Sequence, residues 1–440
     1  MSLRLASEAT FRRIADTVLS ASKADDTFIS FNDSESSTLR FANNQVAQNV
    51  SVREPNVSIR AAFGKKNGSA STNRLDANSL IAALRKAEAI ARLAPEDPEY
   101  LPPLPKQKYM DVPSFRSSTA SATPMDVAKR TQPVIDQCEK NGLVGAGILT
   151  NSVSARGVAA SSGLFGYNQS TEAEFSLTAT ADDSSGWTYN SHRDINALDV
   201  AARTRRAVDK AIRSKAPREL PPGHYPVIFE PAAVAGVLGS VLFALDAKSY
   251  FKGDSALGGK LDSQILDPRL TFRTDPSHRD LIGEPFDRSG LATKAMNWVD
   301  RGVLKQLHFD RFTAAEHHVD PTPRPGAPIL SFAGPTAKSI DELIAGTKRA
   351  VLITNFWYIR SVDPADLTIT GMTRDGTFLV EDGRIVAGVR NFRFHDSPLR
   401  CFASIEAATT PMEAITMERG KMLLPAVRLP DFHLSSVTKF

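Results

Sequence analysis

The sequence predicts an α+β protein with two parts: a duplicated N-terminal domain of helices and strands, and a β-rich, barrel-like C-terminal domain. Three observations predict this division. The chain has 440 residues, which is too long for one ordinary core. The pattern of its first part returns about 118 residues later. From about Ile265 onward, short strand patterns separated by Gly and Pro dominate.

The first copy of the repeat begins with a helix and continues into strands. From about Ser7 to Ala21, apolar residues recur at helical spacing. Asn67-Gly68 predicts a hairpin turn, and a second helix begins near Asp76, a favourable N-cap residue. The strand-like runs between the two helices are Thr27–Asn32, Thr38–Val52 with a break, and Val57–Phe63.

The second copy follows the same order. Pro124–Cys138 has a helical pattern, in which Pro133 kinks the helix or marks its beginning. Chance similarity between two ordinary α+β units is the alternative to a true duplication. A duplication predicts one continuous antiparallel sheet with helices covering one face. The matching segments are residues 57–63 and 175–181, Asn67-Gly68 and Ser185-Gly186, and Asp76–Leu80 and Asp194–Leu198.

Two proline-rich stretches divide the chain. The N-terminal domain is predicted to span residues 1–216, with related halves at about 1–95 and 118–215. The stretch between them, residues 95–117, is rich in Pro and charge and is predicted to be a surface linker. Pro217–Pro222 then opens the C-terminal domain, residues 217–440.

The C-terminal domain begins with a strand and an apolar helix. Tyr225–Phe229 has the pattern of a buried strand, and Val234–Leu245 that of a buried helix. Val351–Ile359 is predicted to be another buried strand. Leu379–Val386 is predicted to form a hairpin around Asp382-Gly383. These elements favour a twisted or barrel-like sheet.

The composition is typical of a folded globular protein. Hydrophobic residues make up 42% of the chain and charged residues 23%, which excludes a disordered chain. The net charge is only +4, and the basic residues are dispersed, so nucleic-acid binding is not expected. The small basic groups Lys65-Lys66 and Arg203–Arg206 are predicted to be a turn and a solvated helix face.

The sequence also predicts a cytoplasmic protein without a membrane anchor. Cys138 and Cys401 lie too far apart to suggest a disulfide framework, which favours a reducing compartment. The N-terminus has no apolar segment of the kind found in secretory signals. The most apolar stretch, Ala232–Ala247, is interrupted by Asp246 and is shorter than the roughly 20 residues of a membrane span.

Several motifs in the C-terminal half resemble one known family. Phe286–Thr293 followed by Asp300–Lys305 is similar to the "FD-x-x-G-x-x-T … G-x-L" signature of the TldD/TldE (PmbA) family. The order and spacing of the motifs are specific, and the resemblance covers essentially the whole chain. The further matching segments are Ile340–Ile344, Thr354–Tyr358, Asp375–Phe378, Glu381–Ile385 and the ending near Asp431-Phe432.

The resemblance implies a metalloprotease family, but the metal-binding motif is missing. Such proteases place two His about one helical turn apart, with a Glu beside the first. The catalytic family member, TldD, carries an H-E-x-x-x-H helix soon after the strand that opens its C-terminal domain. The matching helix here, Val234–Leu245, has neither His nor Glu, and the adjacent His317 and His318 lack the required separation. We therefore predict no catalytic residue, metal ligand or cofactor-binding residue.

Two other segments were considered as sites. His395, Asp396 and Cys401 lie close together in sequence and offer metal ligands, but a polar turn with a free buried Cys is the favoured alternative, because another His would have to come from a distance. Gly253–Lys260 resembles a phosphate loop with one residue too many, and Leu261 stands in place of Ser or Thr. It is predicted to be a flexible loop, and His317-His318 a surface segment.

The resemblance to the TldE/PmbA side of the family implies a non-catalytic subunit. Such a subunit would dimerise with a TldD-type zinc metalloprotease, or with itself, and take part in proteolysis or maturation of unfolded peptides. The exposed face of the N-terminal sheet and the strand edges of the C-terminal domain could hold an extended peptide by strand addition. One alternative is a metallopeptidase with unrecognised ligands. Another follows the family's older name, modulator of DNA gyrase, and makes the protein a regulator that binds gyrase or DNA.

Overall fold

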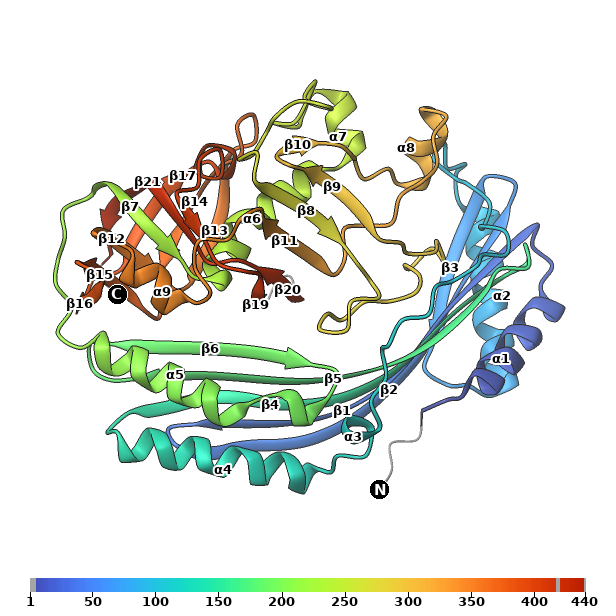
Figure 1. Ribbon diagram of the computed structural model, residues 1–440. Coiled ribbons are helices and arrows are strands. Elements are labelled where there is room, and N and C mark those ends of the chain that lie inside the picture. The colour runs from blue at the N-terminus through green and yellow to red at the C-terminus, as the bar shows by residue number, and fades with distance from the viewer. Residues whose placement is uncertain (1–4, 417–419, 439–440) are drawn as a thin grey trace.

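The N-terminal domain is built on one continuous antiparallel sheet (Figure 1). The computed structural model describes residues 5–416 and 420–438, so the first four residues of the N-terminus discussed above lie outside it. The strand order is β3-β2-β1-β4-β5-β6, so the two halves meet where β1 pairs with β4. The strands are β1 Asp26–Ala42, β2 Gln45–Phe63, β3 Lys66–Thr72, β4 Val144–Ala160, β5 Phe165–Thr180 and β6 Ser185–His192.

Helices cover one face of this sheet, as the duplication predicts (Figure 1). In the first half, Phe11 of α1 stacks on Phe31 of β1, with ring centroids 5.2 Å apart. In the second half, Val134 of α4 and Ala207 of α5 pack against Phe175 of β5. The helices are α1 Glu8–Ala21, α2 Ala77–Leu93, α3 Ser117–Ala120, α4 Pro124–Lys140, the 3-10 helix η1 Ile195–Ala197 and α5 Val200–Arg213.

The strand register confirms the duplication. Val57 of β2 pairs with Thr72 of β3, and Phe175 of β5 pairs with Asn190 of β6. Each residue of the second pair lies 118 positions after its counterpart in the first pair, since 175 − 57 and 190 − 72 both equal 118. A chance similarity between two α+β units would not reproduce the pairing residue by residue.

One predicted turn was wrong. Asn67-Gly68 lies inside β3, and the turn is three residues earlier, at Gly64-Lys65, between the paired residues Phe63 and Lys66. Gly68 is there because a Cβ at this position would lie 2.5 Å from the backbone nitrogen of Ala91 in α2. The break predicted within the run Thr38–Val52 is confirmed, because Asn43 and Asn44 adopt positive φ and turn the chain from β1 into β2.

The structure also determines where two of the predicted helices begin. Asp194 caps only the short η1, and α5 begins at Val200 after the N-cap Asp199. The α4 helix begins at Pro124, and Pro133 lies inside it. Thr123 starts α4 through a capping box, in which its hydroxyl accepts from the backbone of Asp126.

The C-terminal domain contains two sheets that curl into a half-barrel above the N-terminal sheet (Figure 1). One sheet has the order β10-β9-β8-β11-β20-β19, and the other β13-β14-β17-β21-β7-β12-β15-β16 with β18 beside β21. The strands are β7 Gly223–Phe229, β8 Leu270–Thr274, β9 Met296–Asp300, β10 Val303–Leu304, β11 Pro328–Phe332, β12 Arg349–Ile353, β13 Phe356–Asp363, β14 Thr368–Thr373, β15 Thr377–Glu381, β16 Arg384–Gly388, β17 Phe392–Asp396, β18 Ala407–Ala408, β19 Met412–Thr416, β20 Gly420–Leu424 and β21 Val427–Val437.

Short helices accompany these sheets. The hairpin around Asp382-Gly383 is confirmed by the pairing of β15 with β16. The predicted strand Val351–Ile359 is two strands, because the chain leaves β12 after Ile353 and re-enters a sheet at Phe356 as the mostly exposed edge strand β13. The helices are α6 Pro231–Ala244, α7 Ala247–Lys252, α8 Arg311–Glu316, α9 Ile340–Ala345 and α10 Pro398–Cys401.

The two domains pack through apolar and polar contacts. Phe286 of the C-terminal domain packs against Phe28 and Val158 on the sheet face opposite the helices. Tyr109 of the linker lies against the same Phe286 ring, with centroids 4.9 Å apart. None of the described helices is long and apolar enough to cross a bilayer.

Candidate functional site

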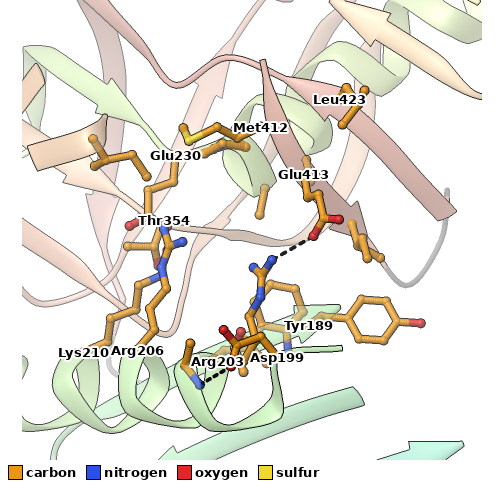
Figure 2. A pocket seen from close by; sticks show the side chains of 18 of the residues that line it. Tyr189, Asp199, Arg203, Arg206, Lys210, Glu230, Thr354, Met412, Glu413 and Leu423 are labelled. Carbon is orange, nitrogen blue, oxygen red and sulfur yellow. Dashed lines mark hydrogen bonds and ion pairs between the residues drawn. The ribbon is translucent and has the colours of Figure 1, made fainter. Parts of the chain in front are cut away.

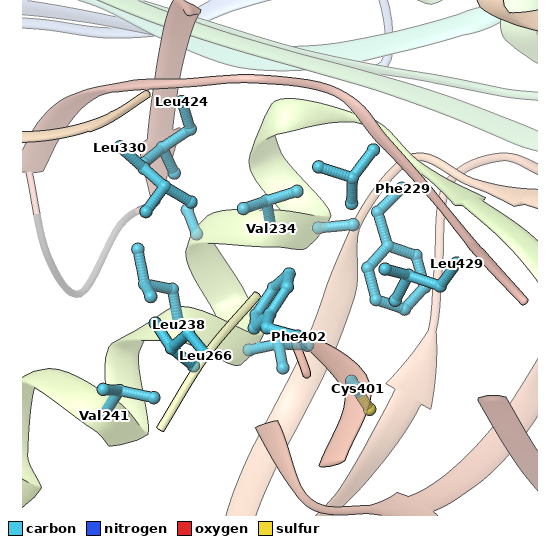
Figure 3. Close-up of a cluster of buried hydrophobic side chains, with 14 of the residues drawn as sticks. Phe229, Val234, Leu238, Val241, Leu266, Leu330, Cys401, Phe402, Leu424 and Leu429 are labelled. Carbon is cyan, nitrogen blue, oxygen red and sulfur yellow. The ribbon is translucent and has the colours of Figure 1, made fainter. Parts of the chain in front are cut away.

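The helix that the sequence resemblance matches to the metal-binding helix of the family is α6, which follows strand β7. Pro231 occupies its first turn, where the missing backbone N–H costs nothing. The helix is apolar on all sides, as expected of a buried helix, and a large core cluster surrounds it (Figure 3). Val234, Leu238 and Val241 are at most 1% exposed. The prediction of a buried core helix is therefore confirmed.

The side chains of α6 do not suit a metal ion. Val241 and Leu245 are buried aliphatic groups without lone pairs. Ser240 donates its hydroxyl to the carbonyl of Val237 at 2.9 Å. Zinc in proteins takes thiolate, imidazole or carboxylate ligands, and none of these belongs to this helix. The chemistry of the donor set does not fit the metal that the family resemblance implies.

Cys401 is a buried thiol beside the same core. It ends the short helix α10, which contacts α6, and is 3% exposed (Figure 3). Burial raises its pKa well above the ordinary value, and the nearby Asp396 carboxylate raises it further. In the metal-free chain, a thiol of this kind stays protonated at neutral pH.

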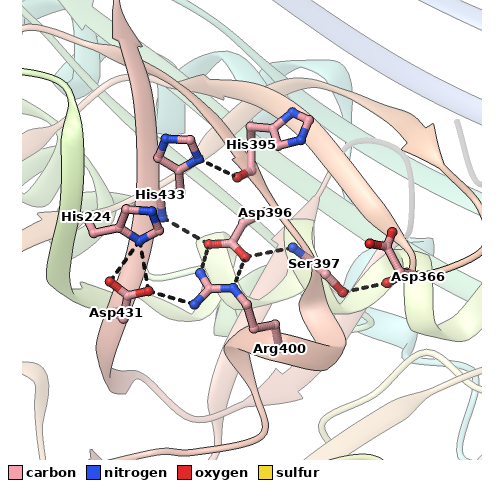
Figure 4. A network of polar contacts seen from close by, with 8 residues as sticks. All are labelled: His224, Asp366, His395, Asp396, Ser397, Arg400, Asp431 and His433. Carbon is pink, nitrogen blue, oxygen red and sulfur yellow. Dashed lines mark hydrogen bonds and ion pairs between the residues drawn. The ribbon is translucent and has the colours of Figure 1, made fainter.

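His395 and Cys401 are not brought together as ligands of one ion. Strand β17 alternates, so Phe394 and Asp396 are buried and His395 is exposed. Asp396 bonds Arg400 in two places and accepts a bond from the backbone N–H of His433 at 2.9 Å (Figure 4). Among residues 5–416 and 420–438, no group of three or more His, Cys, Asp or Glu is arranged to hold a metal.

A pair of histidines lies next to this ion pair. His224 and His433 face each other across β7 and β21, with parallel rings 4.6 Å apart (Figure 4). The Asp431 carboxylate accepts from Nδ1 of His224 at 2.9 Å and from Arg400 at 2.6 Å. Burial raises the pKa of Asp431, but hydrogen bonds from Arg400 and His224 outweigh this and lower it overall. These contacts connect β21 to strand β7 and to helix α10.

The remaining sequence candidates lie at the surface or in the core. His317 follows the last residue of α8 and stacks on Phe251 at 3.8 Å, and His318 is exposed beside it. Residues 253–260 form turns after α7, beginning with the left-handed Gly253. Cys138 is a residue of α4 and lies in the core of the N-terminal domain, where burial raises its pKa to about 11. None of these segments contributes to the cleft described next.

A cleft of about 590 Å³ separates the two domains (Figure 2). Its N-terminal wall consists of α5 and the end strand β6, whose Trp187 and Tyr189 rings lie 6.1 Å apart. Its C-terminal wall is formed by the start of α6 and by Met412 and Glu413 of β19. The described residues lining this cleft include no His or Cys.

A buried ion pair closes one end of the cleft. Glu230, just before α6, accepts hydrogen bonds from Arg206 at 2.7 Å and from Lys210 at 2.9 Å (Figure 2). Burial raises the pKa of Glu230, but the two cations outweigh this and hold it below its ordinary value. Because Lys210 and Arg206 lie on α5, this carboxylate joins the two domains.

A second ion pair spans the cleft. Arg203 of α5 donates to Glu413 of β19 at 2.8 Å (Figure 2). Lys421 of β20 lies 2.8 Å from the other oxygen of Glu413, and burial lowers the pKa of this lysine. The prediction that Arg203–Arg206 is a solvated helix face was wrong, because Arg203 and Arg206 both bind carboxylates of the C-terminal domain.

A further cavity of about 810 Å³ lies on the other side of Lys421. Glu172 of β5 lines it, and burial together with Glu174 raises the pKa of Glu172. Ser191 donates to Glu172 at 2.7 Å. Perturbed ionisable groups in a cleft are typical of functional sites, although interdomain ion pairs produce them too. The sequence offered no signal for this arrangement, because Glu172 and Ser191 lie in the N-terminal domain and Lys421 lies in the C-terminal domain.

Comparison with known proteins gives the family. Three family models match in order: PmbA/TldA metallopeptidase domain 1 at residues 29–91, the central domain at 114–215 and the C-terminal domain at 222–436. The chain therefore belongs to the PmbA/TldD metallopeptidase family, as the sequence motifs predicted.

Curated relatives share limited identity with the chain. It is 23% identical over 253 residues to a metalloprotease of Methanothermobacter thermautotrophicus, an overlap of 52% of this chain and 54% of the relative. It is 23% identical over 217 residues to the metalloprotease PmbA of Escherichia coli O157:H7, an overlap of 48% of this chain and 47% of the relative. The chain spans about half the length of the curated relatives it matches.

Solved structures share the whole fold. A protein described as a modulator of DNA gyrase from Thermotoga maritima aligns with a TM-score of 0.86 at 20% identity, covering 96% of this chain and 99% of the other. TldE from Thermococcus kodakarensis aligns with a TM-score of 0.86 at 19% identity, covering 97% of this chain and 100% of the other. At these identities the likeness shows the fold alone.

Proposed function

We propose that this protein is the non-catalytic, TldE/PmbA-like subunit of a peptide-processing metalloprotease. In this proposal, a TldD-type subunit supplies the zinc and performs hydrolysis. This chain binds that subunit and helps to enclose the unfolded peptide. The observation that carries the proposal is the composition of α6, the helix that the sequence resemblance matches to the family's metal-binding helix, which is filled with Val234, Leu238 and Val241.

The energetics of α6 support a structural role. Placing the imidazole and carboxylate groups of a metal site at Leu238 or Val241 would bury polar groups in a close-packed core. An unpaired buried polar group costs several kcal/mol, roughly 2–7 depending on the reference state. The chain therefore uses this helix for packing, and the helix is complete without an ion.

The interdomain cleft supports a role in handling peptides. It is open, it contains two aromatic rings, and its charges are largely paired across the domains. Such a surface suits contacts with a polypeptide whose sequence varies, because aromatic rings contribute apolar contact with little loss of side-chain entropy. The cleft supplies binding surface, and the partner's metal supplies the reaction.

Regulation of DNA gyrase is the second candidate function. The relatives from Thermotoga maritima and Bacteroides thetaiotaomicron are described as modulators of DNA gyrase. A direct effect on this enzyme would appear as a change in supercoiling by purified gyrase when the chain is added. Binding to DNA itself would weaken steeply as salt is raised.

Reconstitution tests the proposal. The chain is expressed with and without a TldD-type subunit that carries H-E-x-x-x-H, and both preparations are given an unfolded peptide. We expect the two chains to co-purify, and cleavage to require both. The control is a partner whose motif Glu is changed to Gln, which should still co-purify but not cleave. Cleavage by this chain alone, or no association with the partner, would overturn the proposal.

A further inference from the structure

Strand β2 has a long edge that no other strand covers within residues 5–416 and 420–438. β3 pairs only with Val57–Phe63 of β2, so the preceding residues pair with β1 on one side and with no described strand on the other. Every residue from Gln45 to Glu54 is exposed. An uncovered edge offers a row of backbone donors and acceptors to another strand, and proteins usually protect it.

The second half of the repeat shows how this edge is protected elsewhere in the same molecule. The equivalent edge of β5 is covered by the linker between the two halves. The backbone N–H of Thr171 donates to the carbonyl of Ser114 at 3.0 Å, and the Ser114 hydroxyl donates to the carbonyl of Gln169 at 2.6 Å. Arg116 donates its backbone N–H to the Thr171 hydroxyl at 2.9 Å. No described segment does the same for β2.

The repeat also shows which backbone groups of β2 point outward. Ser51 pairs with Ser37 of β1 as Gln169 pairs with Ala155 of β4, with the same offset of 118 in both strands. Gln169 and Thr171 direct their backbone groups away from β4 toward the linker. The equivalent residues Ser51 and Arg53 therefore direct theirs away from β1, toward the open side.

We propose that this edge binds the same edge of a second copy of the chain, so that two N-terminal sheets join through antiparallel β2 strands. The segment that pairs is Gln48–Glu54, and the two-fold axis passes through Ser51. This inference concerns the isolated chain and does not depend on the proposed role beside a protease.

The boundaries of the edge select this register. A bulge shifts the register of β2 near Ala47, since Arg40 pairs with Gln48 but Phe41 pairs with Val46. At the other end, Pro55 has no N–H to donate, so it ends a ladder. The regular segment between the two is Gln48–Glu54, and its midpoint is Ser51. Self-pairing about this midpoint uses the whole regular segment.

The side chains of the segment suit self-pairing. About Ser51, each Val50 lies opposite the partner's Val52, and the two valines are 37% and 41% exposed in the single chain. Arg53 faces an Asn and Glu54 faces a Gln, so no like charges oppose each other. The ladder would contain about six backbone hydrogen bonds. An isologous two-fold contact of this kind is the commonest way for identical chains to associate.

A cysteine at the proposed axis tests the register directly. In an antiparallel pair that exchanges hydrogen bonds, opposed Cα atoms are about 5.5 Å apart, within the range of a disulfide. The variant Ser51→Cys should therefore form a covalent dimer under mild oxidation. The matched control is Gln169→Cys, the equivalent position on the covered edge, which should stay monomeric on a non-reducing gel. The native Cys138 and Cys401 are buried and do not interfere.

Charge substitution tests the surface without a crosslink. The double variant Val50→Lys, Val52→Lys places like charges opposite each other, and its dissociation constant by analytical ultracentrifugation should rise at least about tenfold. The control, Val362→Lys with Val386→Lys, adds the same charge to exposed valines of other strands and should leave the dimer unchanged. Circular dichroism verifies that each variant folds.

Three results would overturn the inference. They are a wild-type chain that sediments as a monomer at high micromolar concentration, a dimer unaffected by charges at Val50 and Val52, and equal crosslinking of the two cysteine variants. Crosslinking of Ser51→Cys only to a co-expressed metalloprotease subunit would also overturn it, because the occupant would then be that subunit.

Discussion

At the scale of single residues, Glu230 is the carboxylate whose buried ion pairs join the two domains. It is buried between Lys210 and Arg206 at the junction of the two domains. Removing its charge leaves the Lys210 ammonium, whose side chain is 11% exposed, and the Arg206 guanidinium without their shared partner. Breaking a buried ion pair from one side costs about 3–5 kcal/mol.

We predict that Glu230→Gln lowers the free energy of unfolding by about that amount, as measured by denaturant titration. The control is Asp209→Asn, which breaks the exposed ion pair with Arg213 and should cost at most about 1 kcal/mol. Equal losses in the two variants would show that Glu230 contributes nothing beyond a surface contact.

The pH dependence of this pair follows from the lowered pKa of Glu230. Its ordinary value is 4.5, and in the folded chain it is lower. A carboxylate with a lowered pKa stabilises the folded state above the ordinary value, and that stabilisation is lost as pH falls below it. The difference in stability between wild type and Glu230→Gln should therefore shrink as pH falls below 4.5. A difference that grows in acid would contradict the assignment.

The two cysteines provide a second prediction. Cys138 and Cys401 are both buried, and burial raises the pKa of both thiols. A protonated, enclosed thiol reacts slowly with disulfide reagents. We expect no appreciable reaction with Ellman's reagent in the native protein and two reactive thiols per chain in guanidinium chloride. Rapid reaction of one thiol in the native state would show an open site at that cysteine.

At the scale of elements, two equivalent glycines set the distance between helix and sheet in each half. A Cβ on Gly68 would lie 2.6 Å from the carbonyl of Ala87 in α2, and one on Gly186 would lie 2.0 Å from the carbonyl of Ala207 in α5. Both contacts involve backbone, which cannot move aside as a side chain can.

We predict that Gly68→Ala and Gly186→Ala each destabilise the protein by roughly 1–3 kcal/mol, the usual cost of overpacking. The control is Gly223→Ala in β7, where the nearest neighbour of the added Cβ is a Tyr225 ring carbon at 3.8 Å. Thermal unfolding of the three variants is the measurement. A neutral effect of both test substitutions would mean that the helices stand farther from the sheet than described.

Individual elements were predictable where local chemistry determines them. The start of α1 at Ser7, the alternation of Val57–Phe63 and the burial of α6 all follow from capping or hydrophobic period. The prediction of a turn at Asn67-Gly68 was wrong. The sequence alone does not distinguish a glycine that close packing requires from a glycine that a turn requires. Only the helix that packs on Gly68 distinguishes the two cases.

At the scale of the whole molecule, the duplication explains why the fold class could be predicted. A repeat with a constant offset predicts a symmetric sheet, and the pairing of β1 with β4 completes it. The interdomain cleft could not be predicted in this way. Arg203 and Glu413 are 210 positions apart, and no periodicity relates residues that meet only after two domains dock.

The family assignment and the catalytic role depend on different parts of the molecule. The motifs that identify the family lie in turns and strand ends that shape the backbone. Under the proposed function, catalysis requires metal ligands on the helix that corresponds to α6, and α6 is filled with aliphatic side chains. The proposal is therefore that this chain keeps the family fold and leaves the metal chemistry to its partner.

The most direct measurement is the zinc content of the purified chain, set beside its peptidase activity. We expect well below one zinc per chain after dialysis and no cleavage of an unfolded peptide, with no change in either quantity on Cys401→Ala. One tightly bound zinc per chain, lost together with peptidase activity in that variant, would contradict the account.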